Sequence, residues 1–253
     1  MKIGFFDSGL GGITILRSTL RQLPYYDYVY YGDTANVPYG DKSEEEIVEL
    51  TERGLQFLFD NDVVLGVVAC NTASAETLRK LQDTFLAGDY PDRRVLGVII
   101  PTIEELIESG ARRALLIGTK RTIDSHKYQQ ELKKRNITDI QFSAIATPTL
   151  VLKIEAQKVE DALKDCTEAI ESRVGEIDTL VLGCTHYTEL KKGLRELYGK
   201  RLMIMSQDEI IPRKLTEYLL RHPEIENQLS RGETCAIHLT KHSEEYDRIV
   251  QEF

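Results

Sequence analysis

Two cysteines occur at corresponding places in the two halves of the sequence. Cys70 ends the apolar run VVLGVVAC and Cys184 ends the run DTLVLGC, and polar residues that can begin a helix follow each of them. In an open α/β sheet this position is the carboxyl edge of a strand, where ligands bind. Two thiols that face one ligand from opposite sides can remove a proton from one face and return a proton to the other. This is the chemistry of a racemase that needs no cofactor.

Further signals of strand ends repeat in the same order. Ser8 and Thr119 each follow an apolar run, as do Pro38 and Pro148. These pairs, like the two cysteines, are separated by roughly 110 residues, a period too long for a solenoid. We interpret the pattern as a degenerate duplication of one α/β unit. The alternative is that strand ends of any α/β chain share an offset by chance.

Polar neighbours of the two cysteines match this chemistry. Asn71 and Thr72 follow Cys70 and can cap a helix or bind the amino and carboxylate groups of an amino acid. A helix N-terminus would also lower the pKa of the Cys70 thiol. His186 follows Cys184 by two residues and can act as its hydrogen-bond partner or as a proton relay. The alternative is that both thiols are inert core residues and that His186 is only structural.

The turn after the first apolar run is a candidate anion site. In the segment DSGLGG, the glycines that follow Asp7 and Ser8 let backbone N–H groups approach a ligand. This segment matches neither GxxxxGK[ST] nor GxGxxG, which argues against a nucleotide. In the alternative interpretation, Asp7 only caps the following helix.

Three other segments also place polar groups at strand ends. Pro38, Tyr39 and Gly40 form a rigid turn whose backbone can reach a carboxylate. The segment GTKRT brings the hydroxyl groups of Thr119 and Thr122 to the start of a helix. Thr185 follows Cys184 at the same edge, and Glu155 can reach the cleft if its segment is extended or a first helical turn; otherwise Glu155 is an isolated surface residue.

Composition narrows the class of protein. The chain has 253 residues, 42% of them hydrophobic, and a formal net charge of −9. This charge argues against a nucleic acid as the main partner. There is no apolar run of membrane-spanning length and no secretory signal at the start, so a cytoplasmic location is expected. The four cysteines lack metal-finger spacing and are expected to be free thiols, with Cys166 and Cys235 in structural positions.

Apolar runs alternate with helical patterns, which predicts parallel sheets covered by helices. Capping boxes are expected at Ser43 and Thr102, the second opening a helix that ends near Gly110. We expect one α/β domain over about 1–96, completed by a helix, a strand and a last helix in 207–253, and another over 97–206. Strands are expected at 2–6, 27–31, 64–69, 94–99, 113–117, 140–145, 178–182, 202–206 and 235–239.

As a set, these motifs resemble the glutamate racemases of the cofactor-independent aspartate/glutamate racemase superfamily. The resemblance runs through FDSGLGG, YGDTANVPYG, VVACNTAS, IGTKRTIDSHKY and LGCTHY. It implies two similar parallel-sheet domains with the active site in the cleft between them, no cofactor or metal, often a homodimer, and D-glutamate production for peptidoglycan. It also implies catalytic roles for Cys70, Cys184, Asp7, His186 and Glu155. The implied substrate contacts are Ser8, Pro38, Tyr39, Gly40, Asn71, Thr72, Thr119, Thr122 and Thr185.

The sequence departs from the family pattern at two points that bear on the substrate. Thr188 replaces a usual proline, and Lys153 lies two residues before Glu155. An ammonium group in the cleft would alter how a second carboxylate is held, so an aspartate or other amino-acid racemase is the nearest alternative. Two further alternatives are a hydrolase or transferase that uses Cys184 as nucleophile with His186 as base, and an amino-acid-binding protein without catalysis.

Overall fold

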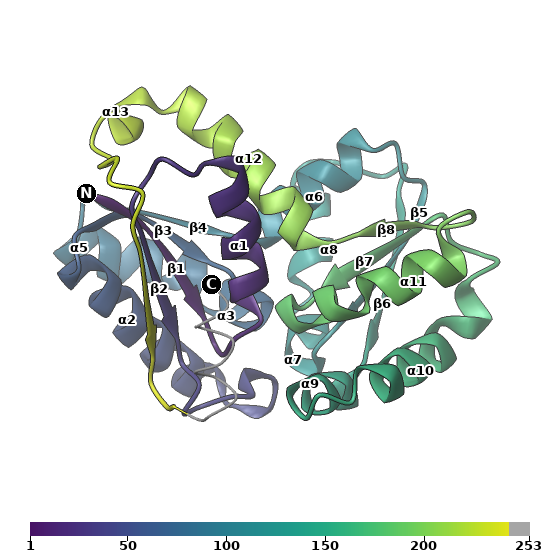
Figure 1. Cartoon of the computed structure of the whole chain (residues 1–253). Coiled ribbons are helices and arrows are strands. Elements are labelled where there is room, and N and C mark those ends of the chain that lie inside the picture. Colours follow the sequence, from purple (N-terminus) through teal and green to yellow (C-terminus); the bar gives the residue numbers. More distant parts are fainter. Residues whose placement is uncertain (243–253) are drawn as a thin grey trace.

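The computed structural model describes residues 1–242 and contains two parallel β-sheets. The five-stranded sheet has the order β4-β3-β1-β2-β9, and the four-stranded sheet has the order β6-β5-β7-β8. We call the five-stranded sheet with its covering helices the first lobe, and the four-stranded sheet with its covering helices the second lobe. Figure 1 shows the two lobes side by side, with their sheets separated by helices. The α/β architecture with two parallel sheets, expected from the sequence, is confirmed.

The elements of the first lobe come mainly from the first hundred residues. They are β1 (Lys2–Asp7), α1 (Gly12–Gln22), β2 (Tyr28–Gly32), η1 (Tyr39–Asp41), α2 (Glu44–Asp60), β3 (Val63–Val68), α3 (Asn71–Glu76), α4 (Leu78–Leu81), η2 (Gln82–Leu86), α5 (Ala87–Asp89) and β4 (Arg94–Gly97). After the second lobe the chain returns through α12 (Gln207–Arg221), α13 (Pro223–Glu226) and β9 (Cys235–Leu239). Strand β9 pairs in parallel with β2 at the edge of the sheet. The last helix expected in the tail lies outside the described residues.

The second lobe is one continuous stretch of the chain. Its elements are α6 (Ile99–Glu108), β5 (Arg113–Gly118), α7 (Lys120–Asp124), α8 (Lys127–Lys134), β6 (Gln141–Ala146), α9 (Pro148–Glu155), α10 (Val159–Ile170), η3 (Glu171–Arg173), β7 (Thr179–Gly183), η4 (Thr185–Leu190), α11 (Lys191–Tyr198) and β8 (Met203–Met205). Its strand order repeats that of the first lobe, because β8-β7-β5-β6 corresponds to β4-β3-β1-β2.

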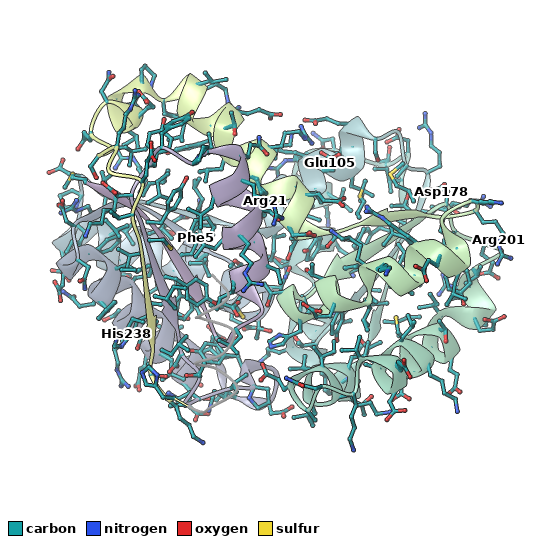
Figure 2. All side chains as sticks on the ribbon, viewed as in Figure 1. Phe5, Arg21, Glu105, Asp178, Arg201 and His238 are labelled. Atoms are coloured by element: carbon teal, nitrogen blue, oxygen red, sulfur yellow. The ribbon has the colours of Figure 1, made fainter. Side chains whose placement is uncertain are left out.

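Alternating side chains of the first sheet are buried on both faces. Phe5 packs with residues of α1 on one face, and Phe6 packs with residues of α2 on the other. Figure 2 shows Phe5 inside the first lobe, whereas His238 lies on the outer edge strand β9. The apolar cluster around Phe5 continues into the second lobe through Leu116 and Val181. The lobes therefore share part of one core, which limits how freely they can separate.

One predicted helix start is wrong. The capping box at Ser43 is present, since its side chain accepts from the backbone N–H of Glu46 at 3.2 Å. Thr102, in contrast, lies inside α6, which already begins at Ile99, and its hydroxyl donates to the carbonyl of Val98 at 2.7 Å. The apolar residues expected to continue strand 94–99 form the buried start of α6 instead.

Among the described residues, none of the helices combines the length and the apolar composition that a membrane span requires.

Candidate active site

A small cavity lies between the carboxyl edges of the two sheets. In the first lobe the chain leaves β1 towards one edge of the sheet and β3 towards the other, and the site lies beside the ends of these two strands. In the second lobe β5 and β7 have the corresponding positions. The cavity has a volume of about 20 Å³. Its lining residues are Ser8, Val37, Pro38, Tyr39, Gly40, Cys70, Asn71, Thr72, Thr119, Val151, Cys184, Thr185 and His186. No lysine or arginine is among them.

Cys70 occupies the end of β3 and caps α3. Its sulfur accepts from the backbone N–H of Ala73 at 3.5 Å. We expected the helix N-terminus to lower the pKa of this thiol, and this expectation is wrong. Burial, aided by the negative charge of Asp7, raises the pKa of Cys70 to about 12, although hydrogen bonds from Ser8 and Ala73 oppose the shift. Cys70 is therefore a neutral thiol at neutral pH.

Cys184 faces the cavity from the second lobe and forms a chain with two further groups. Its sulfur lies 3.8 Å from Nδ1 of His186, and Nε2 of His186 hydrogen-bonds the carboxylate of Glu155 at the end of α9. Burial alone would lower the pKa of His186, but the contacts with Cys184 and Glu155 raise it well above its usual value. The two thiols thus have different environments, because Cys184 contacts the imidazole of His186, whereas Cys70 is contacted by Ser8 and the backbone N–H of Ala73.

Asp7 lies beneath the cavity and does not line it. Its carboxylate accepts from the backbone N–H groups of Gly9 at 3.2 Å and Gly12 at 3.1 Å, and from the Thr185 hydroxyl at 3.4 Å. Burial raises the pKa of Asp7, while His186 and the two backbone N–H groups lower it. Asp7 therefore organises the turn at the start of α1 and also contacts the opposite lobe.

A glycine permits the close approach of the lobes at this point. A Cβ atom added to Gly11 would lie 2.9 Å from the backbone nitrogen of His186 and would overlap the side chain of Thr185. Tyr30 donates a hydrogen bond to the carbonyl of Gly9 at 2.8 Å and so fixes the same turn from below. The turn after β1 thus fits against the segment after Cys184.

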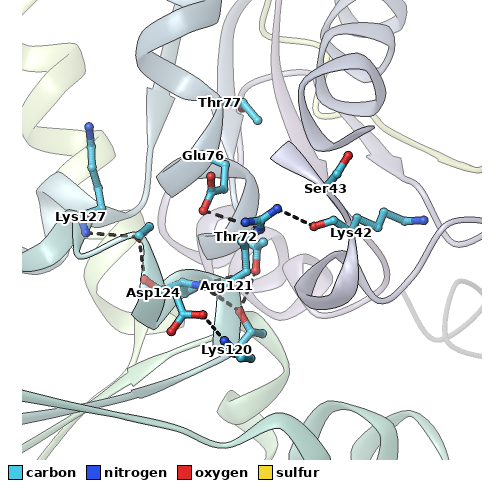
Figure 3. Close-up of polar contacts among 12 residues, drawn as sticks. Lys42, Ser43, Thr72, Glu76, Thr77, Lys120, Arg121, Asp124 and Lys127 are labelled. Atoms are coloured by element: carbon cyan, nitrogen blue, oxygen red, sulfur yellow. Dashed lines mark hydrogen bonds and ion pairs between the residues drawn. The ribbon is translucent and has the colours of Figure 1, made fainter. Parts of the chain in front are cut away.

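Threonine hydroxyls join the lobes on the other side of the cavity. The hydroxyl of Thr72 lies 3.0 Å from that of Thr119 and 3.3 Å from that of Thr122, and Thr119 in turn donates to Thr122 at 3.0 Å. Thr119 also caps α7 by accepting from the backbone N–H of Thr122 at 3.2 Å. Figure 3 shows Thr72 close to α7. Thr122 supports this cluster without lining the cavity.

The loop that carries Pro38 and Gly40 is anchored through Tyr39. The Tyr39 hydroxyl donates to Asp33 at 2.7 Å, and Asp33 also accepts from Asn36 at 2.9 Å and from Thr240 at 2.9 Å. Thr240 directly follows β9, so a segment from the far end of the chain holds this loop in place.

A buried amide network behind Cys70 was not found from the sequence. Asn71 and Gln207 exchange hydrogen bonds of 2.6 and 2.9 Å, and the hydroxyl of Tyr128 donates to Asn71 at 2.8 Å. Gln207 also reaches the hydroxyl of Thr102 at 3.2 Å. These residues come from four helices, and no local sequence pattern links them. The network fixes the amide of Asn71 beside the cavity.

Most residues predicted for the site meet at the cavity, and three lie just behind it. Asp7, Thr122 and Glu155 contact lining residues through the hydrogen bonds described above. The lining residues Val37 and Val151 were missed, although Val151 lies one helical turn before Glu155 on the same face of α9. Lys153 points away, since its ammonium pairs with Asp165 of α10 at 2.5 Å. A larger cleft of about 450 Å³ lies outside the His186–Glu155 pair.

Comparisons with known proteins agree on one family. The family model described as Asp/Glu/hydantoin racemase matches residues 15–209. A glutamate racemase of Oceanobacillus iheyensis is 36% identical over 242 residues, which cover 94% of this chain and 84% of that protein. The crystal structure of the glutamate racemase isoform RacE1 from Bacillus anthracis has a TM-score of 0.87 and 30% identity, covering 99% of this chain and 92% of that one. A glutamate racemase from Francisella tularensis in complex with D-glutamate has a TM-score of 0.85 and 25% identity, with coverage of 99% and 92%.

Proposed function

We propose a two-thiol mechanism for this chain, which belongs to the Asp/Glu/hydantoin racemase family. Its activity is the interconversion of L-glutamate and D-glutamate, in agreement with the consistent names of its relatives. The family implies a role in peptidoglycan synthesis. The observation that carries the proposed mechanism is the placement of Cys70 and Cys184 on different lobes around one cavity.

The two thiols divide the proton transfer between them. In one direction the Cys184 thiolate, stabilised by the His186 imidazolium, takes the α-proton of glutamate while the Cys70 thiol gives its proton to the opposite face. The α-carbon is thereby inverted, Cys184 becomes a thiol and Cys70 a thiolate. In the other direction the two thiols exchange roles. Return to the starting state moves one proton from Cys184 to Cys70, with solvent as the carrier.

The developing carbanion needs stabilisation, because the α-proton of an amino acid is a very weak acid. Among the described residues that line the cavity there is no lysine or arginine, so we expect hydroxyl and amide donors to hold the carboxylates of the substrate. The available side chains are those of Ser8, Asn71, Thr72, Thr119 and Thr185. Such prepositioned dipoles act strongly in a buried site from which water is excluded.

Asp7 and Glu155 are proposed to act through their neighbours. Glu155 keeps His186 protonated, and Asp7 holds the turn that presents Ser8 to the cavity. The domains 1–96 with 207–253 and 97–206 also remain proposals, supported by the division of the strands between the two sheets. The homodimer and the cytoplasmic location expected from the sequence stay predictions.

Racemisation in D₂O tests the mechanism directly. Incubation with L-glutamate is expected to yield D-glutamate that carries one deuterium at the α-carbon, because the returned proton comes from a thiol that has exchanged with solvent. Chiral chromatography with mass detection measures both products. A hydrolase or transferase with Cys184 as nucleophile would give neither inversion nor α-exchange, and a binding protein would retain glutamate unchanged.

Replacement of Lys153 tests the choice of substrate. Because Lys153 pairs with Asp165 away from the cavity, Lys153→Leu is expected to change kcat/KM for either glutamate enantiomer by less than about twofold. Both parent and variant should prefer glutamate, since the shorter aspartate leaves a buried donor unmatched at a cost of about 1–3 kcal/mol.

Steady-state rates with both enantiomers of glutamate and aspartate provide the measurement for Lys153→Leu. Lys164→Leu on the exposed face of α10 is the matched control. Faster turnover of aspartate by the parent would overturn the substrate assignment. A change of preference confined to Lys153→Leu would show that Lys153 acts in the site.

A further inference from the structure

Arg121 of the second lobe contacts two segments of the first lobe that carry site residues. Its Nη2 atom donates to the backbone carbonyl of Lys42 at 2.8 Å, and its Nε atom lies 3.9 Å from the carboxylate of Glu76. Figure 3 shows the guanidinium group between these two partners. The side chain of Arg121 is 31% exposed and that of Glu76 only 11%, so the contact is partly shielded from solvent.

Each partner belongs to a segment that lines the cavity nearby. Lys42 directly follows η1, which begins at Tyr39 beside Pro38. Glu76 is the last residue of α3, the helix that begins directly after Cys70. A planar guanidinium presents its N–H donors in a rigid arrangement, whereas the donors of a lysine ammonium rotate on a flexible side chain. One side chain of the second lobe therefore fixes both the η1 loop and helix α3.

The cavity is too small to hold glutamate. A volume of about 20 Å³ has room for little more than one water molecule. Glutamate has about ten non-hydrogen atoms and buries most of its surface in such a pocket. A movement of the lobes away from each other would admit the substrate. Since Arg121 reaches across the edge formed by η1, α3 and α7, such a movement breaks its contacts with the first lobe.

We propose that Arg121 is a positioning residue that holds the lobes closed around bound glutamate without touching it. This inference rests on the proposed function. When the closed form is strongly favoured in the substrate complex, a moderate loss of its stability still leaves most of the bound enzyme closed and reactive. The same loss directly lowers the apparent affinity for glutamate. Loss of Arg121 is therefore expected to change KM more than kcat.

The test compares initial rates of Arg121→Ala, Arg121→Lys and the parent with both enantiomers. We expect Arg121→Ala to raise KM roughly tenfold for L- and D-glutamate alike, the scale of one lost charged hydrogen bond, with kcat within about twofold of the parent. Arg121→Lys keeps the positive charge beside Glu76 but loses the rigid guanidinium that also contacts the carbonyl of Lys42, so its KM should be intermediate. Lys120→Ala is the matched control, because Lys120 pairs with Asp124 of its own helix, and this variant should leave both constants unchanged.

A double-mutant cycle tests the route of the effect. Glu76→Gln should raise KM less than Arg121→Ala, and the combined variant should raise it less than the product of the two single effects. An unchanged KM in Arg121→Ala, a loss of kcat at constant KM, or an equal shift in Lys120→Ala would overturn the inference. A parent that fails to racemise glutamate would instead overturn the proposed function.

Discussion

Replacing either Cys70 or Cys184 with alanine is expected to lower kcat for glutamate racemisation about a thousandfold or more in both directions. Each thiol serves one face of the α-carbon, and each lobe contributes one thiol to the described lining of the cavity, so the remaining thiol cannot replace the one that is removed. Removal of a positioned proton donor or acceptor costs about 10²–10⁴-fold in rate. The measurement is the initial rate from each enantiomer, followed by the change in optical rotation with time or by a coupled assay for the product. Serine at either position should also lose most activity, because a hydroxyl is a much weaker acid than a thiol.

Cys166 supplies the control for these two variants. It is fully buried in the core of the second lobe and does not line the cavity. Cys166→Ala should keep the parental kcat and lose about 1 kcal/mol of stability from the smaller core side chain. Substantial racemisation by either Cys70→Ala or Cys184→Ala would rule out the two-thiol mechanism.

Glu155→Gln is expected to lower kcat/KM about ten- to a hundredfold and to shift its pH dependence. The carboxylate of Glu155 is one of the contacts that raise the pKa of His186. Neutral glutamine removes that charge, so the pKa of His186 falls and the imidazolium is lost at a lower pH. The alkaline limb of the pH profile should therefore move to lower pH.

Initial rates between pH 6 and pH 10, a range of about 4 units that spans ordinary histidine and cysteine pKa values, provide the measurement. Glu189→Gln is the matched control, because Glu189 lines the outer cleft on an exposed part of η4. An alkaline limb in Glu155→Gln that coincides with the parent would show that Glu155 does not tune His186.

The elements that carry the site follow from local sequence patterns, whereas contacts between lobes do not. Cys70 and Cys184 each stand at the end of an apolar strand, and the paired spacing of the motifs revealed the repeat. The strand orders of the two sheets match, as this interpretation predicts. Thr102 was misassigned because its capping pattern recurs inside a helix whose first turn is apolar. The position of the helix start was decided by burial of Ile99, which no local capping rule includes.

The electrostatics of the site also required three-dimensional information. The position of Cys70 before a helix suggested a lowered pKa, but complete burial next to Asp7 has the opposite effect. From the sequence, Lys153 could alter how the site holds a second carboxylate, because it lies only two residues before Glu155. On α9 the two side chains lie on different faces, and Asp165 of α10 binds the lysine. Gln207 and Arg121 act across lobes, so nothing near them in the sequence identifies their partners.

The position of β9 has a consequence for synthesis of the protein on the ribosome. Strands β5–β8 emerge as one uninterrupted stretch and can pair with each other as soon as they are made. The first sheet must wait for β9, which pairs with β2 across about 200 residues of intervening chain. Until Thr240 emerges, Asp33 lacks one of its hydrogen-bond partners and the Tyr39 loop is incompletely held. The amino-terminal lobe is thus begun first and completed last, and a nascent chain stalled before residue 235 exposes β2 as an unpaired edge.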